Sequence, residues 1–133
     1  MGVTAGDLPR PTNAELGILR VLWDLGPSTV RRVHEYLQSE KATVGYTTIL
    51  KFLQIMHGKG LVERDDSNRA HVYSAQLSRD ATQQQLTSFL IDNVFDGSRS
   101  QLVMQALGGG APASADELAE IRSLLERLEK RQS

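Results

Sequence analysis

Four polar side chains recur within one short segment, residues 46–57. They carry hydroxyl, ammonium and amide groups at spacings that share one side of a helix: Thr47, Thr48, Lys51 and Gln54. The apolar residues recur at i, i+3, i+4 and i+7, which predicts one buried stripe: Ile49, Phe52, Leu53 and Met56. Groups of these polar types bond to the edges of DNA bases, and a helix fits the major groove, about 12 Å wide. The spacing therefore favours a helix that reads duplex DNA.

Basic side chains outside that segment extend the candidate DNA surface. Arg31 falls early in a preceding helical pattern, and Arg69 falls near the tip of an expected hairpin, together with Asn68 and His71. Cationic groups at such places suit contacts to phosphates. The complete predicted DNA-contacting set is Tyr46, Thr47, Thr48, Lys51, Gln54, Arg69 and Arg31. The competing interpretation is an ordinary solvated helix face on an adaptor that binds only protein, since a fold does not fix a function.

Capping and stop residues divide the first half of the chain into helices. Thr12–Glu15 has the form of a capping box, and Gly26-Pro27 ends the helix that it opens. Ser28 is expected to cap a second helix. A third helix covers residues 46–57 and ends at Gly58-Lys59-Gly60.

Two short strands are predicted after the third helix, at residues 61–65 and 70–74. Turn-forming residues join them at positions 66–68. Three helices followed by a hairpin are the element order of a winged helix-turn-helix. The expected fold is therefore mainly α, with a flexible tail at 1–11 and a winged DNA-binding domain at 12–76.

Residues 77–133 show helical patterns only, and we expect a helical dimerisation region there. Possible capping boxes begin at Ser98 and Ser114, and a glycine-rich joint covers residues 108–112. The last helix has apolar residues at spacings of 3, 4 and 3, a narrow seam of the coiled-coil kind. Packing against the same chain is the alternative to pairing with a second copy. The predicted dimer interface comprises Leu86, Phe89, Leu90, Leu102, Val103, Leu107, Leu118, Ile121 and Leu125.

Composition removes several classes of chemistry. The 133-residue chain has no cysteine, which excludes disulfides and thiolate metal sites, and its three histidines lack the spacing of metal ligands. No catalytic constellation stands out, so we expect no enzyme, no cofactor and no metal.

The formal net charge of −1 requires any DNA surface to be a local patch. No run of about 20 apolar residues and no signal peptide is recognisable, so we expect a cytoplasmic protein without membrane insertion.

Several motifs, taken in order, resemble those of one family of regulators. They are Thr12-Asn13-Ala14-Glu15-Leu16-Gly17-Ile18-Leu19, Val21-Leu22-Trp23, Ser28-Thr29-Val30-Arg31-Arg32-Val33, Tyr46-Thr47-Thr48-Ile49-Leu50, Gly58-Lys59-Gly60-Leu61-Val62, Arg69-Ala70-His71-Val72-Tyr73, Phe95-Asp96-Gly97-Ser98, Leu102-Val103 and Glu117-Leu118. Their order and spacing resemble the penicillinase-repressor (BlaI/MecI/CopY) family of winged-helix transcriptional regulators.

This resemblance implies a homodimeric repressor of transcription on a palindromic operator. Base contacts would fall on Thr47, Thr48 and Lys51, and wing contacts near Arg69. Members often answer to a membrane-bound metalloprotease sensor that triggers cleavage of the repressor in its C-terminal region.

The chain departs from two patterns within that family. The Asn-Phe bond cut in the β-lactam-responsive members would fall near Gln105-Ala106, where no such pair is present. The cysteine cluster of the copper-responsive members is also missing. Thiolate copper sensing and cleavage at that position are therefore not expected.

Overall fold

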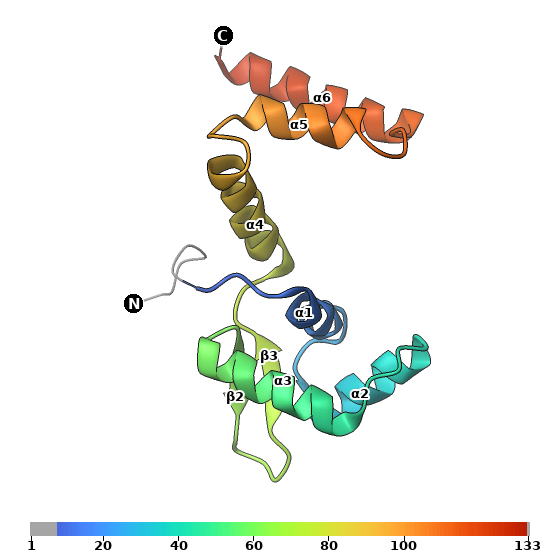
Figure 1. Ribbon diagram of the computed structural model, residues 1–133, viewed down its shortest axis with the longest axis vertical. Helices are drawn as coiled ribbons and strands as arrows, with labels where there is room; N and C mark the ends of the chain where they lie inside the picture. The colour runs from blue at the N-terminus through green and yellow to red at the C-terminus, as the bar shows by residue number, and fades with distance from the viewer. Residues whose placement is uncertain (1–7, 133) are drawn as a thin grey trace. The chain divides into compact units, whose positions relative to one another are not determined.

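The computed structural model describes residues 8–132 and is mainly helical (Figure 1). Its elements are α1 (Asn13–Leu25), β1 (Ser28–Thr29), α2 (Val30–Ser39), α3 (Tyr46–Lys59), β2 (Val62–Asp65), β3 (Val72–Ala75), α4 (Arg79–Asn93), α5 (Arg99–Gly108) and α6 (Ala115–Gln132). Three helices followed by a hairpin confirm the winged helix-turn-helix. The chain forms two compact units, of which the first ends at Ser88 and the second begins at Phe89. Residues 1–7 of the predicted tail lie outside the described residues.

The core of the first unit is built from the apolar faces of its three N-terminal helices and its sheet. Three residues of the predicted stripe, Ile49, Leu53 and Met56, are buried, and Phe52 is half-buried against them. Burying such side chains stabilises the fold by roughly 1.5–3 kcal/mol each. The other buried members of this core are Ile18, Leu19, Val21, Leu22, Val30, Val33, Leu61, Val62 and Tyr73.

The sheet has three antiparallel strands in the order β1-β3-β2, with β3 in the centre. Thr29 is opposite Val72 in the β1–β3 pair, and Asp65 is opposite Val72 in the β2–β3 pair. The two predicted strands are present as β2 and β3, whereas β1 was not predicted. Residues 28 and 29 become a strand through pairing with residues more than 40 positions away, which no local pattern reveals.

The cap of α2 differs from the prediction. Ser28 is buried, and its hydroxyl donates to the Gly26 carbonyl at 2.8 Å. Thr29 is the N-cap instead, because its Oγ1 accepts the amide of Arg32 at 3.2 Å. The predicted cap was therefore one residue too early.

The predicted end of the third helix was also too early. The helix α3 continues through Gly58 to Lys59, and Gly60 adopts a left-handed conformation with φ of 84°. A Cβ added at Gly60 would lie 3.3 Å from Cδ2 of Leu8. Glycine thus serves here both the turn and the close approach of the N-terminal segment.

Two capping boxes form as predicted. The Thr12 amide donates to Oε1 of Glu15 at 2.8 Å, and the Glu15 amide donates to Oγ1 of Thr12 at 3.2 Å. Ser114 and Glu117 exchange the same two bonds, each at 3.1 Å. At α5, Oγ of Ser98 accepts the Gln101 amide at 3.2 Å.

An ion pair joins the start of α1 to the end of α3. Nζ of Lys59 lies 2.9 Å from Oε2 of Glu15, whose side chain is only 2% exposed. Burial alone raises the pKa of the Glu15 carboxyl, but hydrogen bonds from Thr12 and the charge of Lys59 outweigh it. The pKa of Glu15 therefore lies below its ordinary value.

No helix among residues 8–132 is long and apolar enough to cross a membrane.

Replacing Lys59 by Met is expected to lower the free energy of unfolding by about 2 kcal/mol, against about 1 kcal/mol for Glu15→Gln. The first change leaves a buried carboxylate without its cation. The second leaves a Lys59 side chain that is 37% exposed and can be hydrated. Urea denaturation measures both losses, with Lys59→Arg as the charge-retaining control. Equal losses would contradict this account.

The contribution of Glu15 is expected to disappear in acid. Folding favours the ionised carboxyl, so its stabilisation is present above the ordinary pKa of 4.5 and is lost as the pH falls through the lower folded value. The stability difference between wild type and Glu15→Gln should shrink as the pH falls below 4.5. Urea denaturation across this pH range tests it, and a constant difference would contradict the assignment.

Candidate nucleic-acid interface

The exposed face of α3 carries the four polar side chains singled out by the sequence. Thr47, Thr48, Lys51 and Gln54 are all exposed, while the apolar stripe of the same helix faces the core. The helix begins after Gly45, which offers no side chain to cap it. Amides of the first turn therefore point out of the helix end with a partial positive charge, an arrangement that suits an anion.

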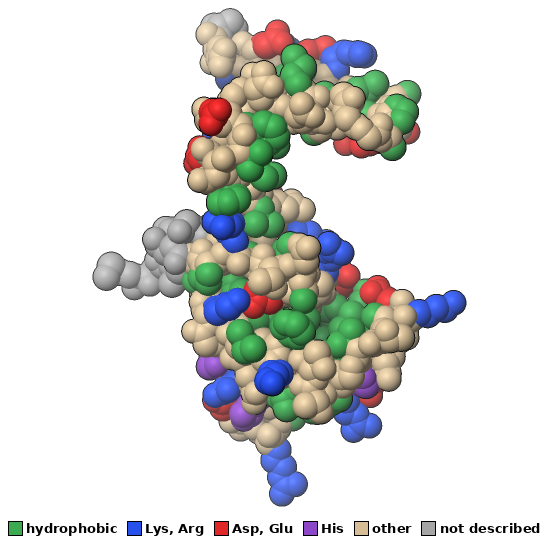
Figure 2. Space-filling view, viewed as in Figure 1, with side chains coloured by type: hydrophobic (Ala, Val, Ile, Leu, Met, Phe, Trp, Pro, Cys, Tyr) green, Lys and Arg blue, Asp and Glu red, His purple; other side chains and the backbone are tan. Residues whose placement is uncertain are grey.

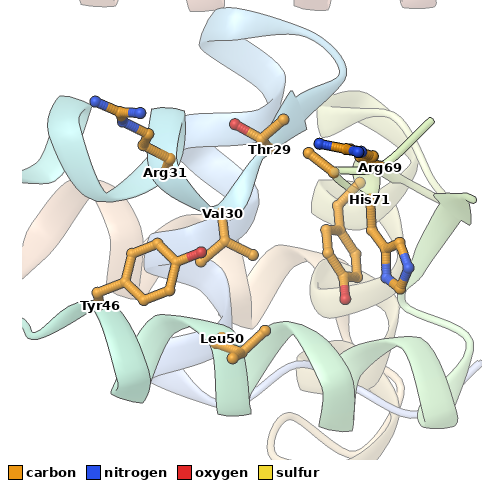
Figure 3. A pocket seen from close by; sticks show the side chains of 9 residues that line it. Thr29, Val30, Arg31, Tyr46, Leu50, Arg69 and His71 are labelled. Atoms are coloured by element: carbon orange, nitrogen blue, oxygen red, sulfur yellow. The ribbon is translucent and has the colours of Figure 1, made fainter.

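A concavity of about 500 Å³ lies beside this helix (Figure 3). In Figure 3, Tyr46 and Leu50 stand on α3, Arg31 on α2, and Arg69 and His71 belong to the hairpin. The complete lining is Thr29, Val30, Arg31, Tyr46, Leu50, Arg69, Ala70, His71 and Tyr73. No acidic residue occurs among these described lining residues, so the concavity combines an apolar floor with a cationic rim.

The cations of this rim are accessible to a ligand. Arg31 forms an ion pair with Glu35 at 3.2 Å, but both side chains are mostly exposed. Exposed pairs of this kind contribute little to stability and exchange readily. Arg69 lies in the exposed turn between β2 and β3. Both arginines are therefore available to approach a phosphate without unfolding any element.

Two aspartates of the wing, the hairpin of residues 62–75, have their partners within the wing itself. Oδ1 of Asp66 lies 2.8 Å from Nε of Arg64 and 3.6 Å from Nδ1 of His71. Asp65 accepts the Ser67 amide at 2.9 Å, and its hydrogen bonds to Ser67 hold the pKa of Asp65 below its ordinary value. These contacts turn the carboxylates toward neighbouring wing groups.

An aromatic contact places the start of α3 against α2. The rings of His34 and Tyr46 meet edge to face, with centroids 5.9 Å apart and planes at 85°. Such pairs favour a defined geometry. Tyr46 is therefore positioned by the preceding helix, although nearly half of its surface is exposed.

The comparisons with known proteins match this architecture. The family model for penicillinase repressors covers residues 11–127. The chain is 32% identical to the transcriptional regulator BlaI of Mycobacterium tuberculosis over 124 residues, 92% of this chain and 87% of that protein. The same match is found for two strains of that organism. The chain belongs to the penicillinase repressor family.

A solved structure of a probable transcriptional regulator from Pseudomonas aeruginosa is also similar, at 21% identity. The match covers 85% of this chain and 74% of the chain in that structure, with a TM-score of 0.35. The family comprises transcriptional regulators and not enzymes, so this penicillinase repressor is a repressor of transcription.

This repressor brings together some of the predicted contact residues in a way that the sequence did not reveal. Tyr46, Arg31 and Arg69 line one concavity, although they come from three elements. Thr29 and Tyr73 also line this concavity, and the sequence gives no sign of either there. The available signal for the cap of α2 was Thr29 itself, since threonine is a preferred N-cap residue, as is its neighbour Ser28. Within residues 8–132 no group of three metal-ligating side chains occurs.

The second unit of the repressor presents apolar side chains to solvent (Figure 2). No residue of α5 or α6 is buried. Among the predicted interface residues, Leu90, Val103, Leu118 and Leu125 are exposed. The remaining five are half-buried: Leu86, Phe89, Leu102, Leu107 and Ile121. Exposed leucines on α6 that the predicted interface omits are Leu124 and Leu128.

Proposed function

We propose that this penicillinase repressor binds operator DNA sequence-specifically as a homodimer. The observation that carries the proposal is the polar face of α3 beside a concavity with a cationic rim. The apolar stripe holds this helix on its core, so the polar face is free to enter a major groove. A local patch of this kind is compatible with a net charge of −1.

The two groups of side chains would take different parts in binding. Thr47, Thr48, Lys51 and Gln54 would face base edges, where hydroxyl, ammonium and amide groups distinguish base pairs. Tyr46, Arg31 and Arg69 would lie along the phosphates, which fix the register of the protein without reading sequence.

The apolar surface of the second unit supports pairing of two copies. Leu118, Ile121 and Leu125 recur on one side of α6, a helix without buried residues. A second copy would remove such a surface from water. Two recognition helices would then meet half-sites about one DNA turn, roughly 34 Å, apart, so the operator should be a near-palindrome.

A sensor protein would release the repressor from DNA. The family resemblance suggests a membrane-bound metalloprotease sensor as a partner. Gln105 and Ala106 are exposed on α5, but they do not form the Asn-Phe pair of the β-lactam-responsive members. We therefore expect any cleavage to use another bond. Binding to operator DNA would place the protein in the cytoplasm.

Lys51→Ala is expected to weaken binding to the operator by about 1–3 kcal/mol, with a smaller effect on scrambled DNA, if Lys51 reads a base. The operator is first obtained by selection from random duplexes. Titrations of wild type and variant at several salt concentrations give both affinities. Lys130→Ala, on α6, is the matched control because it removes the same charge from the second unit.

Arg69→Ala provides the contrasting case. Loss of a phosphate contact should weaken all duplexes alike and reduce the salt slope by about 0.9. Equal wild-type affinity for operator and scrambled duplexes would overturn sequence-specific recognition. An affinity without salt dependence would favour a protein-binding adaptor.

Replacing both Leu118 and Ile121 by Asp is expected to convert the dimer to a monomer and weaken operator binding. Charges on the seam oppose its burial, and the loss of linked half-sites lowers the effective concentration. Light scattering measures the mass. The control is Ala119→Asp with Ser123→Asp, which adds the same charge to the other side of α6. An unchanged dimer in the seam variant would remove the seam from the interface.

A further inference from the structure

Within the first unit, a cluster of four side chains joins the start of α4 to α1 and α2. Nη2 of Arg79 lies 2.6 Å from Oδ1 of Asp24, at the end of α1. The other carboxylate oxygen of Asp24 accepts the hydroxyl of Tyr36 at 3.1 Å. The guanidinium of Arg79 also lies 5.6 Å from the ring centroid of Trp23. We call Trp23, Asp24, Tyr36 and Arg79 the latch.

The chain leading into α4 is held at two further points. The indole Nε1 of Trp23 donates to the Leu77 carbonyl at 3.0 Å, while its ring packs against the core. Nearly two turns beyond Arg79, the side-chain amide of Gln85 donates to the Leu8 carbonyl at 2.9 Å. The first turns of α4 therefore have a fixed path on α1 and the N-terminal segment.

The protonation states of the latch residues match its hydrogen bonds. Hydrogen bonds from Arg79, and then from Tyr36, hold the pKa of Asp24 below its ordinary value. The same carboxylate raises the pKa of Tyr36. Asp24 is therefore ionised and Tyr36 protonated at neutral pH, which are the states that the hydrogen bonds require.

The contribution of the latch to stability is expected to be small. The side chains of Arg79 and Asp24 are 49% and 44% exposed, and exposed ion pairs contribute little to folding. What the cluster does fix is direction, because a planar guanidinium held by a carboxylate and an indole ring has few orientations. A role in positioning α4 accounts for this geometry better than a role in stability.

The helix α4 runs without interruption from Arg79 to Asn93, past the point where the first unit ends. We propose that Arg79 is a positioning residue that sets the spacing of operator half-sites accepted by the dimer. It does so by fixing the direction in which α4 leaves the first unit. The inference rests on the proposed function, since half-site spacing has meaning only for a DNA-bound dimer.

The test is a binding profile against spacing. Duplexes carry two copies of the selected half-site, with the spacing changed one base pair at a time. The affinity of the wild type should be highest at one spacing and should fall steeply at the neighbouring spacings. Arg79→Ala should keep the dimer and the affinity for a single half-site, but its discrimination between the best and neighbouring spacings should fall roughly fivefold or more.

Two further variants separate positioning from folding. Arg79→Lys keeps the charge without the planar fork, so its profile should lie between those of wild type and Arg79→Ala. Arg20→Ala removes an arginine from the exposed side of α1, outside the latch, and should leave the optimum sharp. Thermal unfolding of each variant shows whether the first unit remains folded.

Three results would overturn the inference. An unchanged optimum in Arg79→Ala would show that the latch does not set the spacing. A loss by the same factor at every spacing and at the single half-site would show a structural role only. Wild type that binds paired half-sites no better than a single one would overturn the proposed dimeric binding itself, and the inference with it.

Discussion

Burial of one stripe of α3 is the constraint on which the rest of this repressor depends. Ile49, Leu53 and Met56 are all but removed from water, so the helix cannot rotate about its axis without exposing them. The polar side chains between them are consequently held outward. Orientation of the candidate DNA-reading face is thus a product of core packing and needs no separate device.

Periodicity and capping predicted the parts of the fold that depend on neighbouring residues. The α3 stripe and the capping boxes at Thr12 and Ser114 require only residues within about two helical turns of one another. Strand β1 could not be predicted in this way. Its two residues are strand-like only because Tyr73 and Val72 pair with them from a distant part of the chain.

The same distinction between local and long-range contacts applies to the candidate site. The outward face of α3 follows from the helical period alone, and the structure leaves its four polar side chains exposed. The concavity beside it requires α2, α3 and the wing together, and the sequence shows no sign that Arg31 and Arg69 share its lining. The pairing of Arg79 with Asp24, 55 positions apart, was hidden for the same reason.

The central position of β3 bears on how regulators of this kind can be re-engineered. Val72 is opposite residues of both outer strands, so the hairpin and the start of α2 share one ladder of hydrogen bonds. The wing is therefore not a detachable module. A hairpin grafted from a homologue would pair differently with Ser28 and Thr29. Because Thr29 is the N-cap of α2, the start of that helix would be affected as well. A chimera that exchanges residues 62–75 together with 28 and 29 keeps this ladder intact.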